Sequence, residues 1–161
     1  MRLYLVQHGE ALPEEADESR PLSEGGKMDV QGMAEFLEDS GVSIGRLLHS
    51  GKLRAQQTAE YIAHAIFPDG KIETSQKMAP NDSVARFAQQ IGDWNTDVML
   101  VGHLPFMARL VAKLITGNED KQIVTFLPGS IVCLERDELG MWSMAWMLRP
   151  ELLSREYDPQ F

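Results

Sequence analysis

Two short apolar runs, each followed closely by a histidine, constrain the fold of this 161-residue chain more than any other feature. Residues 3–6 (Leu-Tyr-Leu-Val) precede His8, and residues 98–101 (Val-Met-Leu-Val) precede His103. An apolar run that ends where the backbone must turn predicts a β-strand, which delivers the next residues to its carboxyl end. Open α/β sheets build their sites at the carboxyl ends of such strands. We therefore expect the two histidines to face one crevice.

The rest of the chain alternates strand-like and helix-like segments, which predicts an α/β fold with a mostly parallel central sheet. The expected further strands are residues 46–49 and 71–74, and the expected helices are residues 23–39, 53–67, 83–91 and 106–115. Ser23 is the expected N-cap of the first helix, and Pro105 is expected in the first turn of the last one. Two final runs, residues 130–136 and 141–147, predict an antiparallel hairpin at the sheet edge. Residues 149–161 show no clear periodicity, and we expect them to pack loosely or lie across a neighbour.

Length and composition predict one domain over residues 1–161 and restrict the class of partner. The formal net charge is −9, which argues against nucleic acid, because its phosphate backbone demands a basic surface. No stretch is long enough to span a bilayer, and the first strand leaves no room for a signal peptide. The single cysteine, Cys133, cannot form an internal disulfide. We therefore expect a cytoplasmic location and no membrane partner.

Four motifs carry the remaining information. In chain order they are Gln7-His8-Gly9-Glu10, Arg20-Pro21-Leu22-Ser23, the stretch from Ser50 through Arg54 to Thr58 (Ser-Gly-Lys-Leu-Arg-Ala-Gln-Gln-Thr), and Gly102-His103-Leu104-Pro105. Together they resemble the histidine phosphatase (phosphoglycerate mutase-like) superfamily, and within it the short SixA-type phosphohistidine phosphatases. The resemblance implies a three-layer α/β/α sandwich and a phosphatase that needs no cofactor or metal. It also implies a phosphohistidine-bearing protein as substrate and inorganic phosphate as product.

Chemistry and resemblance together give each motif residue an expected role. A neutral imidazole can attack phosphorus if its other ring nitrogen donates to a backbone carbonyl, so His8 is the expected nucleophile. The transferring phosphoryl group needs positive and hydrogen-bonding groups around it, and Arg54, Arg20 and His103 are the expected suppliers. Gln7, Gly9 and Ser50 are further candidate phosphate contacts. For Ser50 we favour a role as cap of the helix that follows.

One departure from the superfamily pattern leaves alternatives open. The superfamily has Arg-His-Gly where this chain has Gln7-His8-Gly9, and glutamine keeps hydrogen-bond donors but no charge. Losing one charge-assisted hydrogen bond costs about 1.5–3 kcal/mol. A weakly active phosphate-binding or recognition module therefore remains an alternative, as does a phosphatase of small phosphate esters.

The small-ester reading requires a proton donor, for which Glu10 and Asp82 are the candidates, with Glu73 a weaker one. His49 and His64 are expected to be structural or solvated. The sequence has neither an aspartate-rich cluster nor a His-x-His spacing, so it does not predict a dinuclear metal site.

Overall fold

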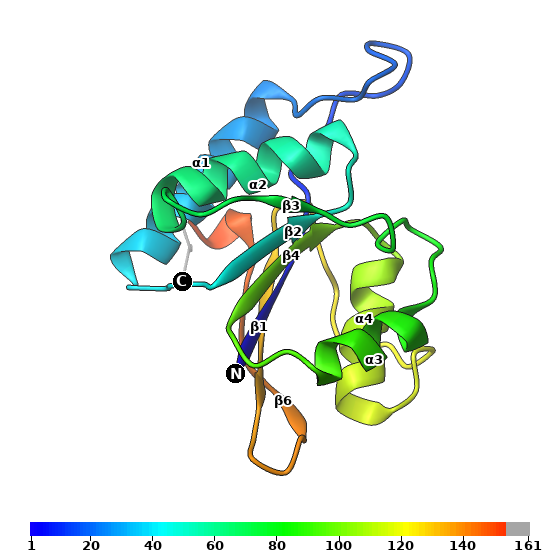
Figure 1. The fold of residues 1–161 in the computed structure, drawn as a ribbon. Coiled ribbons are helices and arrows are strands. Elements are labelled where there is room, and N and C mark those ends of the chain that lie inside the picture. Colours follow the sequence, from blue (N-terminus) through cyan, green and yellow to red (C-terminus); the bar gives the residue numbers. More distant parts are fainter. Residues whose placement is uncertain (154–161) are drawn as a thin grey trace, which may run out of the picture.

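The computed structural model describes residues 1–153, which form one six-stranded sheet with helices on both of its faces (Figure 1). In chain order the elements are β1 (Arg2–Gln7), α1 (Glu24–Asp39), β2 (Arg46–His49), α2 (Leu53–Ile66), β3 (Glu73–Thr74), α3 (Val84–Gly92), β4 (Val98–Gly102), α4 (Phe106–Thr116), β5 (Ile131–Arg136), β6 (Trp142–Leu148) and a short 3₁₀ helix, η1 (Pro150–Leu152). No helix within residues 1–153 is long and apolar enough to cross a membrane.

The strands follow the order β3-β2-β4-β1-β5-β6 across the sheet. The pairs β3–β2, β2–β4 and β4–β1 are parallel, whereas β5 runs antiparallel to both β1 and β6. The predicted parallel sheet with an antiparallel hairpin at its edge is therefore confirmed. Because β4 and β1 lie in the middle of the sheet, the two strands that carry the histidines are neighbours.

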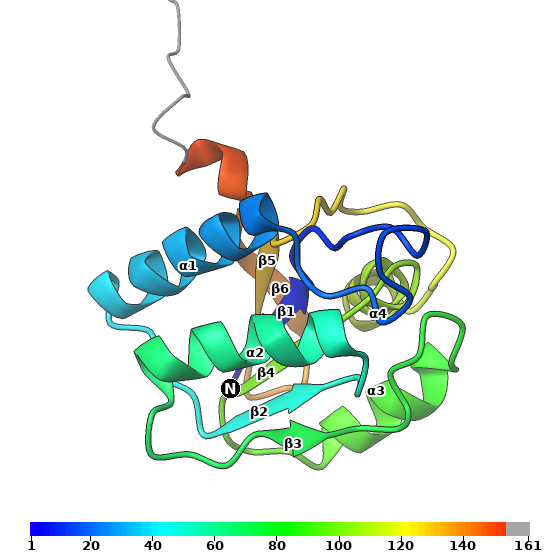
Figure 2. The same ribbon diagram turned by 90° about the horizontal axis from the view of Figure 1, so that it is seen from above.

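Two separate layers of core hold the helices against the sheet, which confirms the three-layer sandwich (Figure 2). Alternate residues of β1 point to opposite faces, as in any strand. Leu3 and Leu5 join the core under α3 and α4, whereas Tyr4 and Val6 join the core under α1 and α2. Burial on both faces explains why β1 and β4 are continuous apolar runs.

Most element boundaries agree with expectation, including the N-caps. The Ser23 hydroxyl accepts the Gly26 amide at 3.0 Å, so Ser23 caps α1, and Ser83 caps α3 in the same way. The structure corrects three details. β3 is only Glu73–Thr74, Pro105 is the N-cap of α4 and lies just before its first turn, and β6 begins one residue later than expected.

The C-terminal stretch is more ordered at its start than the sequence predicts. Residues 150–152 form η1, with Pro150 buried, and η1 contacts α1. The remainder of that stretch, residues 154–161, lies outside the described residues.

Candidate active site

The strand register places the two histidines side by side. Gln7 of β1 pairs with Gly102 of β4, so the next residue of each strand, His8 and His103, emerges at the same level of the sheet edge. The His8 amide donates to the Gly102 carbonyl at 3.0 Å, and the two imidazole centroids are 4.9 Å apart at an interplanar angle of 54°. Two rings this close can contact one small ligand at the same time.

The His8 ring has a defined tautomer. Its Nδ1 lies 2.7 Å from the Gly9 carbonyl oxygen. Because a carbonyl can only accept, Nδ1 carries the proton and Nε2 keeps its lone pair. Burial is the main cause that lowers the pKa of His8 from 6.5 to about 4, and the nearby Arg54 and Arg20 add to it against the opposing hydrogen bond to Gly9. The free protein therefore holds His8 as a neutral base with Nε2 available.

His103 is almost fully buried and is also held neutral. Its Nε2 lies 2.5 Å from the Ser50 hydroxyl oxygen, whereas its Nδ1 is buried and has no hydrogen-bond partner among residues 1–153. Burial lowers the pKa of His103 to about 3, and the neighbouring His8 and Arg54 contribute further. One ring nitrogen is thus engaged by the protein, and the other remains for a ligand.

Two arginines contribute positive charge that no carboxylate in residues 1–153 neutralises by an ion pair. Arg54 lies in the first turn of α2, and its Nε is buried without a hydrogen-bond partner in the described part of the chain. Burial lowers the pKa of Arg54, with a further contribution from Arg20, which places the two guanidinium groups near each other. Arg20 has a positive φ of 49°, and its Nε donates to the Leu12 carbonyl at 3.1 Å.

Gln7 completes the set of unsatisfied groups. The residue is only 8% exposed, and its Oε1 accepts no hydrogen bond from any of the described residues. With Nε of Arg54 and Nδ1 of His103, this makes three buried polar atoms without a partner at neighbouring strand exits. Buried polar groups are nearly always satisfied in native proteins, so such a cluster indicates a ligand site. The arginine and the surrounding positive charge favour an oxyanion there, whereas Oε1 of Gln7 can only accept a hydrogen bond and would not bind one.

Two residues of α2 that received no role from the sequence hold the site loops in place. Thr58 accepts the Gly9 amide at 3.0 Å and donates its own hydroxyl to the Arg54 carbonyl at 2.8 Å. Gln57 accepts the Leu22 amide at 2.8 Å. Both residues stand in the motif that supplied Arg54, and their helical spacing from it was the available clue. The Gly9 amide is therefore engaged by Thr58 in the free protein, and a contact of Gly9 with phosphate stays a prediction.

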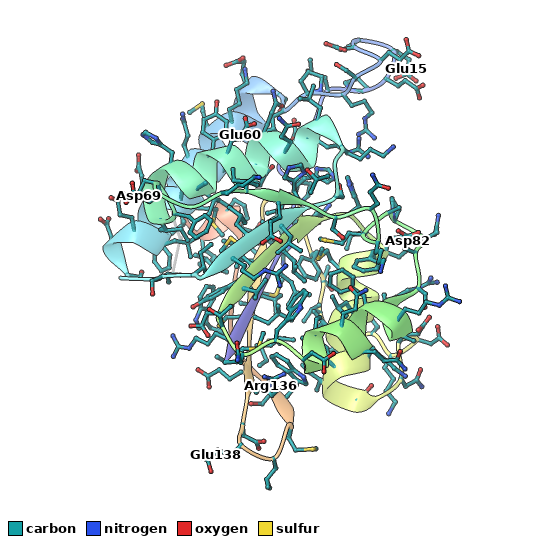
Figure 3. The ribbon with its side chains drawn as sticks, viewed as in Figure 1. Glu15, Glu60, Asp69, Asp82, Arg136 and Glu138 are labelled. Atoms are coloured by element: carbon teal, nitrogen blue, oxygen red, sulfur yellow. The ribbon has the colours of Figure 1, made fainter. Side chains whose placement is uncertain are left out.

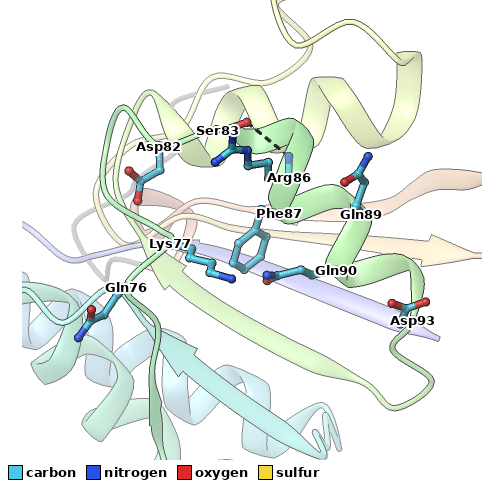
Figure 4. A pocket seen from close by; sticks show the side chains of 9 residues that line it. All are labelled: Gln76, Lys77, Asp82, Ser83, Arg86, Phe87, Gln89, Gln90 and Asp93. Atoms are coloured by element: carbon cyan, nitrogen blue, oxygen red, sulfur yellow. Dashed lines mark hydrogen bonds between the residues drawn. The ribbon is translucent and has the colours of Figure 1, made fainter.

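The two stronger candidate proton donors, Glu10 and Asp82, are engaged elsewhere. The Glu10 carboxylate accepts the Ser23 hydroxyl at 3.1 Å, and the Asp82 carboxylate accepts the Ala79 amide of its own loop at 2.8 Å. Asp82 also lines a pocket of about 450 Å³ beside α3, which contains neither site histidine (Figure 4). Neither carboxylate contributes to the pKa shifts of His8 or His103.

Three smaller expectations have clear outcomes. Lys52 is the N-cap of α2, and Ser50 contacts His103, so the favoured role of Ser50 as a helix cap is wrong. His49 is buried, and its Nδ1 accepts the Gly51 amide at 3.0 Å, which is a structural role. His64 is exposed on α2. Within residues 1–153 no group of three or more His, Cys, Asp or Glu side chains is placed to hold a metal ion.

Comparison with known proteins places this arrangement in a wider group. The chain is 28% identical over 155 residues to phosphohistidine phosphatase SixA of Escherichia coli, covering 93% of this chain and 94% of that protein. It is 33% identical over 126 residues to an uncharacterised protein of Picosynechococcus, covering 73% and 75% of the two chains. The structure of the protein histidine phosphatase SixA complexed with tungstate superposes with a TM-score of 0.85 at 28% identity, covering 96% of this chain and all of that one. No family model matches the chain.

The fold, with two histidines and an arginine near one edge of a parallel sheet, matches structures of the histidine phosphatase class, SixA among them. By sequence and by structure the chain is a homologue of the phosphohistidine phosphatase SixA.

Proposed function

We propose that this protein is a phosphohistidine phosphatase that works through a transient phosphohistidine at His8. The observation that carries the proposal is the His8 ring, whose Nδ1 proton is held by the Gly9 carbonyl while Nε2 keeps its lone pair. Two arginines that form no ion pair within residues 1–153 lie near this ring. The similarity to SixA over nearly the whole chain supports the same activity.

In the first step, Nε2 of His8 attacks the phosphorus atom in line and forms a new P–N bond, while the bond from phosphorus to the substrate nitrogen breaks. A substrate imidazole that is protonated on its other nitrogen leaves as a neutral ring and takes its electron pair with it. It therefore needs no proton from the enzyme. The commitment of Glu10 and Asp82 to other partners is compatible with this substrate and unfavourable for an alkyl phosphate ester, whose leaving oxygen must be protonated.

In the second step, water attacks the phosphorylated His8, the P–N bond breaks, and inorganic phosphate and neutral His8 result. In both steps charge spreads over three phosphoryl oxygens, and stabilising it is the main catalytic task. We assign this task to Arg54, Arg20 and the Nδ1 side of His103, with the Gln7 side-chain amide as a neutral contact. Because Nε of Arg54 and Nδ1 of His103 lack partners among residues 1–153, these two groups need little reorganisation when phosphate binds.

We further propose that the phosphohistidine is presented on another protein. The interval from Arg54 to His103 holds α2, β3, α3 and β4, so no long insertion is available there to close over a small metabolite. The exposed acidic loop at residues 14–18 projects from the body of the molecule, with Glu15 at its outer end (Figure 3). Its negative charge would disfavour acidic sugar phosphates and favour a less acidic docking face.

We also propose that the reaction needs no metal, because Arg54 and Arg20 can supply the charge that a metal would otherwise provide. The cytoplasmic location stays a prediction from the single cysteine, Cys133, which is buried and unpaired.

One experiment tests the nucleophile. Brief exposure to a ³²P-labelled phosphohistidine protein, followed by alkaline quenching, should leave acid-labile label on His8, and His8→Ala should carry none. Full turnover by His8→Ala would refute covalent catalysis at this residue. The same assay with EDTA should be unchanged, and loss of activity that added metal restores would refute metal independence.

A substrate panel tests the specificity. We expect kcat/KM for a phosphohistidine protein to be well above kcat/KM for phosphoserine peptides, phosphotyrosine or phosphoglycerate. Equal turnover of phosphoglycerate would favour the small-ester phosphatase. Tight phosphate binding without turnover of any substrate would favour a recognition module.

A further inference from the structure

Ser50 and His103 form a contact that the proposed chemistry has not yet used. The Ser50 oxygen lies 2.5 Å from Nε2 of His103, which is within hydrogen-bond distance in either direction. If the serine donates, the imidazole proton is on Nδ1. If Nε2 donates, Nδ1 carries only a lone pair. The two tautomers present opposite chemistry to a ligand, because Nδ1 is the ring nitrogen without a hydrogen-bond partner among residues 1–153.

Two neighbouring contacts favour the serine as donor. The Ser50 oxygen already lies 3.4 Å from the Lys52 amide, which can only donate to it, so the hydroxyl proton is directed elsewhere. The Ser50 backbone is itself fixed, because its amide donates to the Val101 carbonyl of β4 at 3.2 Å. The hydroxyl is therefore anchored at the level of the imidazole and can serve as a fixed donor to Nε2.

The expected ligand selects the same tautomer. Phosphoryl oxygens are acceptors, so a lone pair on Nδ1 would repel them and an N–H would bind them. A doubly protonated ring would also donate, but it would add a third positive group beside Arg54 and Arg20 in a buried place. Burial and these cations lower the pKa of His103, which opposes that form.

We infer that Ser50 is a positioning residue: its hydroxyl donates to Nε2 of His103 and holds the uncharged ring with its proton on Nδ1, as a hydrogen-bond donor to the phosphoryl group. The inference rests on the proposed function for its ligand. It gives the site a neutral donor in addition to its two arginines. It also explains why a serine, rather than a residue with only a helix-capping role, stands at the exit of β2.

The tautomer can be read without any turnover. Protein with ¹⁵N-labelled histidine should show, in long-range ¹H–¹⁵N spectra at pH 7, a His103 ring that is protonated on Nδ1 and unprotonated on Nε2. Saturating inorganic phosphate should leave this pattern in place and shift the Nδ1 proton. A ring protonated on Nε2, or on both nitrogens with phosphate bound, would overturn the inference. A correct tautomer in a protein that fails to hydrolyse phosphohistidine would refute the proposed function alone.

Variants test the consequence. Ser50→Ala should weaken phosphate binding and lower kcat by about 5- to 10-fold, the usual effect of losing one neutral hydrogen bond, and should convert part of the His103 population to the other tautomer. Ser50→Thr keeps the hydroxyl and should restore both the tautomer and most of the rate. Ser43→Ala, an exposed serine before β2, is the matched control. Identical tautomer ratios and phosphate affinities in the Ser50→Ala and Ser43→Ala proteins would refute the role of Ser50.

Discussion

Lowering the pH from 7 to 5 should leave both site histidines of the free protein largely uncharged. With a pKa of about 4, His8 would be only about 10% protonated at pH 5, whereas an imidazole at the ordinary value of 6.5 would be about 97% protonated. His103, with a pKa of about 3, would be protonated even less. The nucleophile must be neutral, and the pH dependence of kcat/KM reports the pKa values of the free enzyme. As the pH is lowered, kcat/KM should therefore decrease only near pH 4, well below the pH expected for an ordinary histidine.

The same shifts predict how stability depends on pH. The unfolded chain binds a proton at each histidine below about pH 6.5, but the folded protein resists protonation until about pH 4 at His8 and about pH 3 at His103. The unfolded state therefore binds more protons in this window, and the free energy of unfolding falls as the pH is lowered through it. Each histidine contributes a slope of at most about 1.4 kcal/mol per pH unit.

Histidine NMR and urea unfolding between pH 7 and pH 5 check both effects. His8→Asn and His103→Asn should each make the stability profile flatter over this range, because each removes one suppressed protonation. Added phosphate should raise both pKa values, since an anion favours the charged ring. A His8 resonance that titrates near pH 6.5 in the free protein would refute the burial argument, and with it the neutral resting nucleophile.

Three substitutions test the parts around the histidines. Arg20→Ala should cost about 1.5–3 kcal/mol in kcat/KM, the value of a charge-assisted hydrogen bond, and wild-type kinetics would remove Arg20 from the site. Thr58→Val leaves a buried amide without its acceptor and should lower the free energy of unfolding by about 1–3 kcal/mol, whereas Thr58→Ser should not. Gly26→Ala would place a Cβ 2.1 Å from the Glu10 carbonyl oxygen and should reduce both stability and activity by displacing the site loop. The control is Gly32→Ala on the same helix, where an added Cβ meets nothing within 4 Å. This substitution should raise the free energy of unfolding by about 0.5–1 kcal/mol. Equal effects at the two glycines would contradict the argument that the backbone approaches Gly26 closely.

The positions of the two histidines could be predicted because strand ends are marked in the sequence. An apolar run that stops at a polar residue identifies the exit of a buried strand, and this alone placed His8 and His103 at one edge of the sheet. That β1 and β4 are adjacent is a property of the strand order, which the runs themselves do not encode. The 4.9 Å distance between the rings therefore required the structure.

The supporting contacts were harder to predict because they join residues far apart in sequence. Thr58 lies 49 positions from the glycine whose amide it accepts, and Ser50 lies 53 positions from His103. Local capping rules favoured a short-range role for Ser50, and a longer-range hydrogen bond took precedence. Likewise, the sequence offered Glu10 as a proton donor because it is near His8, but the first turn of α1 engages its side chain through Ser23.

Gln7 determines how strongly this site can hold phosphate. Its Oε1 is buried without a partner among residues 1–153, and the superfamily arginine expected at this position would add a third fixed charge to Arg54 and Arg20. In the free protein that charge would be desolvated and would repel Arg54, so Gln7→Arg should be less stable than wild type without ligand.

With phosphate bound, the extra charge-assisted hydrogen bond should strengthen product inhibition by about 10- to 150-fold, the equivalent of about 1.5–3 kcal/mol. Saturating phosphate should then raise the melting temperature of Gln7→Arg by more than it raises that of wild type. Calorimetry should compare the phosphate affinities of wild type, Gln7→Arg and Gln7→Glu, the variant of opposite charge. Equal affinities in all three proteins would show that this position does not contact the phosphoryl group.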